Sequence, residues 1–160
     1  MTAKEYLQQV RAKDARIRNL QRDKEALRQM MYSLGGSGDG ERVQSSRDMD
    51  KFGTLYSRID AKERAIVEAI DELVDFKLKV SHEISQLSDY RHITVLYKKY
   101  VLFETWEEIA ADMGYNKRYT QRLNGNALLE FGRVHKKMLQ GYDKKRQKRT
   151  EKNMKQPITA

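Results

Sequence analysis

The sequence contains no cysteine and only one proline, Pro157. The lack of cysteine excludes disulfide bonds, thiol catalysis and thiolate metal sites. There is also no apolar run of about 18 residues, because two lysines interrupt the most apolar stretch, ITVLYKKYVLF at 93–103. Residues 1–20 are charged throughout and lack the apolar segment of a signal peptide. We therefore expect a soluble, cytoplasmic protein without a membrane partner.

Charged residues are abundant and unevenly distributed. They make up 34 % of the 160 residues, against roughly 25 % in an ordinary globular domain. With so little proline, this composition predicts a helical, elongated chain with a thin core. The net charge is +9, which favours nucleic acid as a partner. Residues 136–155 hold nine Lys or Arg and two acidic residues, so this segment carries +7 of that charge.

Two long segments have apolar residues spaced alternately four and three apart, which is the pattern of a heptad seam. The first spans residues 3–34, and its seam consists of Tyr6, Val10, Ile17, Leu20, Leu27, Met31 and Leu34, with Lys13 and Lys24 in the remaining positions. The second spans residues 48–88, and its seam consists of Phe52, Tyr56, Ile59, Glu63, Ile66, Ile70, Leu73, Lys77, Val80, Ile84 and Leu87. Both segments are predicted to be long helices.

The motif GGSGDG at 35–40 separates these helices and predicts a loop over residues 35–47. Two heptad helices with a flexible connection favour an antiparallel, coiled-coil-like hairpin over residues 1–88, because folding back buries both apolar seams. The same seams could instead pair between two chains, which makes a homodimer through this arm the competing arrangement.

Residues 89–135 are denser in apolar and aromatic side chains and predict a compact domain. Ser88 or Asp89 can begin a helix, and Thr105 with Glu108 forms the Thr-x-x-Glu capping box of the next. Gly114 stands where a left-handed residue would end that helix. The small Ala110, four residues earlier, permits the close helix crossing of a helix-turn-helix.

Asn116 is expected to cap the second helix of this motif. Its inward side would consist of Tyr119 or Thr120, Leu123, Ala127, Leu128 and Phe131. Its outward side offers side chains that can hydrogen-bond to base edges in the major groove. The predicted DNA-binding residues are Asn116, Lys117, Arg118, Tyr119, Gln121 and Arg122, with Tyr119 either packing or contacting a phosphate. The acidic residues of the preceding helix, Glu107, Glu108 and Asp112, are expected to face away from phosphates.

The stretch TWEEIAADMGYNKRYTQRLNGNALLEF resembles the helix-turn-helix of sigma factor region 4. It is more similar to the RinA/ArpU-like late transcription regulators of phages, whose typical pattern is W-x-x-I-A…Y-S-x-R-x-x-x-R-x-H-G-x-A-L. The matching residues are Trp106, Ile109, Ala110, Tyr115, Arg118, Arg122, Gly125, Ala127 and Leu128. Asn124 replaces the usual His and Asn116 the usual Ser. The resemblance extends over roughly residues 4–135, and nothing resembles sigma region 2.

This resemblance implies a phage or prophage transcriptional regulator, an activator of late genes, that acts on double-stranded DNA in a bacterial host cell with host RNA polymerase as a further partner. A flexible basic tail over 136–160 would add phosphate contacts through Lys144, Lys145, Arg146, Lys148 and Arg149. Two alternatives remain open. One is a small terminase-like DNA-packaging protein, and the other is a structural coiled-coil protein with a nonspecific basic tail.

The sequence offers no catalytic or metal-binding constellation. The three histidines, His82, His92 and His135, have no metal-ligand spacing. GGSGDG lacks the Gly-Lys-Ser/Thr of a phosphate-binding loop, and DMDKFG at 48–53 fails the calcium-loop pattern. We therefore predict a protein that is not an enzyme and needs no cofactor or metal.

Overall fold

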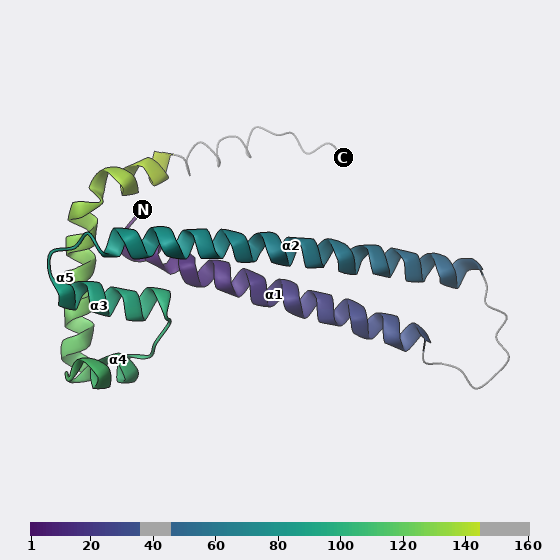
Figure 1. The fold of residues 1–160 in the computed structure, drawn as a ribbon, viewed down its shortest axis with the longest axis horizontal. Helices are drawn as coiled ribbons and strands as arrows, with labels where there is room; N and C mark the ends of the chain where they lie inside the picture. Colours follow the sequence, from purple (N-terminus) through teal and green to yellow (C-terminus); the bar gives the residue numbers. More distant parts are fainter. Residues whose placement is uncertain (36–45, 145–160) are drawn as a thin grey trace. The chain divides into compact units, whose positions relative to one another are not determined.

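The chain is described from a computed structural model that covers residues 1–35 and 46–144, and these residues form an all-α protein (Figure 1). The described ranges contain no strand. The elements are α1 (Ala3–Gly35), α2 (Ser46–Ile84), α3 (Tyr90–Leu96), the π-helix η1 (Tyr97–Val101), α4 (Trp106–Met113) and α5 (Lys117–Val134). Residues 136–144 are also helical. Most of the predicted loop at 35–47 lies outside the described residues.

The chain divides into two compact units, one of Met1–Arg11 with Phe76–Ala160 and one of Ala12–Asp75. The predicted division into an arm (1–88), a DNA-binding domain (89–135) and a tail (136–160) remains a prediction. Within the described part of the chain, no helix combines the length and the apolar character that crossing a membrane requires.

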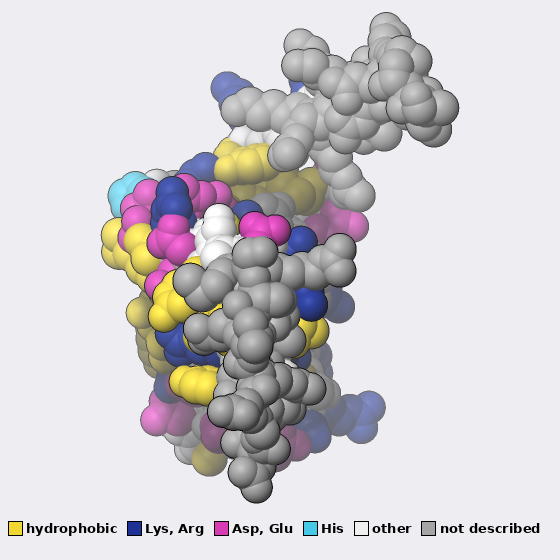
Figure 2. All heavy atoms as spheres, turned by 90° about the vertical axis from the view of Figure 1, so that its right-hand side faces the viewer, with side chains coloured by type: hydrophobic (Ala, Val, Ile, Leu, Met, Phe, Trp, Pro, Cys, Tyr) yellow, Lys and Arg dark blue, Asp and Glu magenta, His cyan; other side chains and the backbone are white. Residues whose placement is uncertain are grey.

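The Ala12–Asp75 unit contains parts of α1 and α2 that are joined by ion pairs. Lys13 pairs with Glu72 at 2.9 Å, and Arg28 pairs with Glu63 at 3.1 Å. Because the partner number falls on α2 as the number rises on α1, the two helices run in opposite directions in this unit. Three of the four polar members of the predicted seams, Lys13, Lys24 and Glu63, therefore hold the helices in register. Figure 2 shows acidic and basic side chains next to one another on the face that it draws.

The apolar seam of α2 differs from the heptad prediction. Ile59, Ile66 and Leu73 are buried as expected, but Tyr56 and Ile70 are 65 % and 41 % exposed. An α-helix has 3.6 residues per turn, so a strict seven-residue repeat drifts around it by about 20° per heptad. Ala69, which is 2 % exposed, takes the buried position beside Ile70. The prediction that Tyr56 and Ile70 belong to the buried seam is wrong for this reason.

The other unit has a core built from both ends of the chain. Tyr6 is fully buried, and its ring lies 5.5 Å from that of Phe76 and 6.1 Å from that of Phe131. Further buried residues are Leu7, Val10, Val80, Ile84, Leu87, Val95, Leu96, Ile109, Leu123, Ala127 and Leu139. Both α3 and α4 pack on α5. The predicted flexible segment from 136 onward thus starts as a helix that buries Leu139 in the core.

Candidate nucleic-acid interface

Local hydrogen bonds fix the start of α4. Thr105 Oγ1 accepts a hydrogen bond from the backbone N–H of Glu108 at 3.3 Å, and Glu108 Oε2 accepts one from the backbone N–H of Thr105 at 2.7 Å. The predicted capping box is therefore confirmed. Such a box satisfies two backbone donors that a helix leaves free at its first turn. Ile109 and Ala110 then face the core, at 0 % and 6 % exposure.

A left-handed glycine ends α4. Gly114 has φ 69° and ψ 28°, a conformation that strains any residue with a Cβ atom. The backbone N–H of Tyr115 then bonds to the carbonyl of Ala110 at 2.9 Å, which closes the helix end. Two residues later, Asn116 Oδ1 accepts a hydrogen bond from the Tyr119 N–H at 2.8 Å and caps α5. Both the glycine turn and the asparagine cap were predicted, and both are confirmed.

The buried side of α5 orients its first two turns. Thr120, Leu123, Ala127 and Phe131 are buried, whereas Leu128 is only partly so. The sequence left Tyr119 and Thr120 as alternatives for the first inward position, and Thr120 occupies it at 0 % exposure. Its hydroxyl donates to the Asn116 carbonyl at 3.1 Å, so this buried polar group is satisfied.

The opposite side of α5 carries the predicted DNA-binding residues. Asn116, Lys117, Arg118, Gln121 and Arg122 are exposed, and Tyr119 is half-buried. The Arg122 guanidinium lies 5.3 Å from the centre of the Tyr119 ring, a cation–π distance that limits where the arginine can point. Asn116, Arg118, Tyr119 and Arg122 together line a surface hollow of about 330 Å³. We call the exposed residues Asn116, Lys117, Arg118, Gln121 and Arg122 the α5 stripe.

The acidic residues of α4 do not all lie away from this stripe. Glu107 forms an ion pair with Lys117, which lowers the pKa of the Glu107 carboxyl. Asp112 instead pairs with Lys98 at 2.9 Å, and Glu108 is engaged in the capping box. The expectation that Glu107 faces away is wrong, because the tight turn at Gly114 brings the first residue of α5 back towards the first turn of α4.

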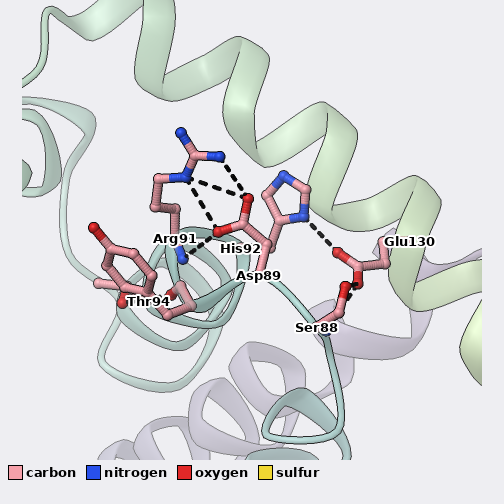
Figure 3. Close-up of polar contacts among 7 residues, drawn as sticks. Ser88, Asp89, Arg91, His92, Thr94 and Glu130 are labelled. Carbon is pink, nitrogen blue, oxygen red and sulfur yellow. Dashed lines mark hydrogen bonds and ion pairs between the residues drawn. The ribbon is translucent and has the colours of Figure 1, made fainter.

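A polar network ties α5 to the segment before α3 (Figure 3). Glu130, near the C-terminal end of α5, accepts hydrogen bonds from the Ser88 backbone N–H at 2.9 Å and the Ser88 hydroxyl at 2.6 Å. It also accepts from His92 Nδ1. These contacts lower the pKa of Glu130 to about 2, with the His92 bond as the largest cause. Sequence reasoning missed Glu130, because its partners lie about 40 residues away along the chain.

Comparison with protein-family models, curated proteins and solved structures gave no match. The resemblance to the phage regulators therefore rests on the residues quoted for it. The geometry of the α5 stripe stands independently of any relative.

The cap of α3 continues the network on the other side of Ser88. Asp89 is the N-cap residue, as one of the two sequence alternatives predicted. Its carboxylate accepts from the Arg91 backbone N–H at 2.9 Å and from two atoms of the Arg91 guanidinium. These bonds lower the pKa of Asp89 to about 2, mainly through the Arg91 side chain. The start of α3 is thereby fixed next to the residue that holds Glu130.

Replacing Glu130 with Gln is expected to destabilise this unit by about 1.5–3 kcal/mol, the range for hydrogen bonds to a charged group. Because the folded-state pKa of Glu130 is lowered to about 2, its ionised form stabilises the fold above the unfolded pKa of about 4.5. That contribution is lost as the pH falls towards 2. Urea unfolding at pH 7 and at pH 3, followed by Trp106 fluorescence, measures the free energy of unfolding. Between pH 7 and pH 3 this free energy should fall less for the variant than for the wild type.

Asp71→Asn serves as the control for Glu130→Gln, since Asp71 is an exposed acid on α2. It should leave the acid dependence of the Trp106 transition unchanged. An acid dependence of Glu130→Gln equal to that of the wild type would contradict the role given to Glu130.

The basic segment after α5 is only partly described. Lys144 is exposed at the last described residue of the 136–144 helix. Lys145, Arg146, Lys148 and Arg149, the other predicted phosphate contacts, lie outside the described residues. Near Lys144, Asp143 pairs with the N-terminal ammonium group of Met1, which ties the end of the 136–144 helix to Met1.

Proposed function

We propose that this chain is a sequence-specific DNA-binding transcriptional regulator of phage or prophage origin that activates late genes. In this proposal α4, the turn at Gly114 and α5 act as a helix-turn-helix like that of sigma factor region 4. The observation that carries the proposal is the α5 stripe. It presents three cations and two amides at the start of a helix whose opposite face is buried.

The mechanism follows from the chemistry of these side chains. The first turns of α5 would enter the major groove, where Arg118 and Arg122 can bond to guanine O6 and N7 and Gln121 to adenine. Each such contact discriminates by about 1–3 kcal/mol. The N-terminal end of α5 also carries the positive end of the helix dipole, which favours an adjacent phosphate. No acidic residue occurs between positions 116 and 129, although Glu107 of α4 pairs with Lys117 at this end of the helix.

The remaining parts would support binding without reading sequence. Residues 136–160 would neutralise phosphates, so affinity should fall steeply as salt rises. The arm made by α1 and α2 would serve dimerisation or docking to host RNA polymerase. The antiparallel ion pairs Lys13–Glu72 and Arg28–Glu63 support an arm that pairs within one chain.

Selection from a random duplex pool tests the sequence-specific part of this proposal. The full chain is incubated with the pool at physiological salt, and bound DNA is amplified over several rounds. We expect a short motif to be enriched, with a length that matches one or two major-groove contacts. A pool that stays random while the protein retains DNA would overturn sequence recognition and leave only electrostatic binding.

Replacing Glu107 with Gln is expected to strengthen DNA binding. In the wild-type chain Lys117 pairs with Glu107. When the substitution removes that carboxylate, Lys117 becomes available to contact a phosphate. One added phosphate contact makes the slope of log affinity against log salt steeper by about 0.9. Fluorescence anisotropy with labelled duplex at several salt concentrations measures this slope.

Glu68→Gln is the matched control for Glu107→Gln, because it removes the same charge from an exposed position on α2. If both variants change affinity and slope equally, then net charge and not the Lys117 pair explains the effect.

A further inference from the structure

The unit of Met1–Arg11 and Phe76–Ala160 contains a pocket of about 280 Å³ that lies outside the α5 stripe. Lys4 and Arg11 of α1 and Lys99 of η1 bring positive charge to it, while Phe103 and Trp106 supply aromatic surface. Small-molecule pockets span roughly 300–1,000 Å³. A volume just below that range limits the occupant to a single small molecule.

The backbone around this pocket is irregular. The chain forms the π-helix Tyr97–Val101, and Phe103 then adopts φ 64°, the one non-glycine residue with positive φ among those described. Both features cost free energy and are frequent at functional sites. Their effect here is to place the Phe103 ring under two cations, with Arg11 at 5.2 Å and Lys77 at 5.0 Å from its centre.

The pocket cations have no acidic partner among the described residues. Lys99 Nζ donates to the Glu104 backbone carbonyl at 3.0 Å and lies 4.3 Å from the centre of the Trp106 ring. Burial, followed by the charge of Arg11, lowers the pKa of Lys99. The charges of Glu107 and Glu108 oppose this shift of the Lys99 pKa. However, Glu107 already pairs with Lys117, and Glu108 is part of the capping box with Thr105. An anion in the pocket would relieve the repulsion between Lys99 and Arg11.

Asn124 adds a second, independent observation. It lines the pocket and is 8 % exposed, and its Oδ1 atom has no hydrogen-bond partner among the described residues. A buried acceptor without a donor is costly, and most such atoms in folded proteins are satisfied. Because Oδ1 is closed to solvent, the Asn124 side chain must rotate before an N–H group of a ligand can supply the missing donor.

We propose that this pocket binds a nucleoside monophosphate. The phosphate would lie among Lys4, Arg11 and Lys99, and the base would lie against Phe103 and Trp106. An amino group of the base would donate to Asn124. This assignment requires both the phosphate and the base, because phosphate alone makes no contact with the two rings and a nucleoside alone supplies no anion to the cations.

The full chain, without DNA, is titrated with adenosine and guanosine 5′-monophosphate, with adenosine and with inorganic phosphate. Trp106 is the only tryptophan and lines the pocket, so its fluorescence reports occupancy, and calorimetry gives an independent affinity. We expect saturable binding of at least one monophosphate. Adenosine and phosphate should bind at least about tenfold more weakly, since each lacks either the charge-assisted or the aromatic contacts.

Arg11→Met and Lys99→Met should each weaken monophosphate binding about tenfold by calorimetry, because each removes a charge-assisted contact. Phe103→Asn removes the ring but tolerates the left-handed backbone, so it should abolish binding while the chain stays folded. Arg118→Met and Lys137→Met remove a positive charge elsewhere and should leave binding unchanged. The proposal is overturned if no monophosphate binds saturably, if phosphate or adenosine alone binds as tightly, or if the pocket variants bind like the wild type.

Discussion

Replacing both Arg118 and Arg122 with Ala is expected to abolish sequence preference while leaving general DNA binding largely in place. Both side chains are exposed on the first turns of α5, and no carboxylate in the described part of the chain pairs with either. Two bidentate base contacts at about 1–3 kcal/mol each predict a loss of about 2–6 kcal/mol on the preferred site. Affinity for unrelated duplex should change far less. Competition binding with the selected motif and a scrambled duplex measures the difference.

The basic segment supplies the contrasting control. Lys136→Ala with Lys137→Ala removes the same number of positive charges from exposed positions beyond α5. This variant should weaken binding to both duplexes alike and reduce the salt slope. If the Arg118 and Arg122 variant keeps its sequence preference while removal of residues 145–160 abolishes binding, the chain is better described as a coiled-coil protein with a nonspecific basic tail.

Replacing Phe131 with Ala should destabilise the unit that holds α5 by about 3–5 kcal/mol, the range for truncating a buried phenylalanine. Phe131 is fully buried, and its ring lies 6.1 Å from that of Tyr6 and 4.4 Å from that of His135. Removing it leaves a cavity where α1, α5 and the 136–144 helix meet. Denaturant unfolding followed by Trp106 fluorescence reports on this unit, because Trp106 belongs to it.

Leu129→Ala is the matched control for Phe131→Ala, because Leu129 is on the same helix and 63 % exposed. We expect it to change the free energy of unfolding by no more than about 0.5 kcal/mol, as for most surface substitutions. Equal destabilisation by the two variants would contradict the placement of Phe131 in the core.

Local signals explain most of what the sequence predicted correctly. Thr105, Gly114 and Asn116 act within three or four residues of themselves, so their roles can be recognised from spacing alone. The extent of α1 and the start of α2 likewise follow from periodicity and from the glycines between them, but α2 ends at Ile84, before the predicted end at residue 88. These signals also indicate which side of α5 is exposed, because its inward residues recur with the helical period.

Features that depend on distant residues were not predicted. The network of Glu130 with Ser88 and His92 joins positions about 40 residues apart. The Lys117–Glu107 pair depends on how tightly the chain turns at Gly114. Asn124 was noted only as a departure from the family pattern, yet it is buried with an unsatisfied oxygen. The ion pairs and hydrogen bonds leave no periodic or local trace in the sequence, whereas the burial of Asn124 follows the helical period of Thr120 and Ala127.

The backbone at Tyr97–Val101 and Phe103 is a further example. Its apolar residues predict an ordinary helix, but the segment forms a π-helix followed by a left-handed phenylalanine. Packing of α3 and η1 against α4 and α5 can override local preference in this way. The basic segment shows the same effect, because burial of Leu139 holds residues 136–144 in a helix despite their charge.

A footprint on the DNA around the chain's own gene tests the central claim most directly. Labelled duplexes that cover this region are digested with nuclease at physiological salt, with and without the full chain. The proposed regulator predicts a discrete protected site that disappears with the Arg118 and Arg122 double replacement. Absence of any protected site, or uniform protection along the DNA, would contradict sequence-specific regulation by this protein.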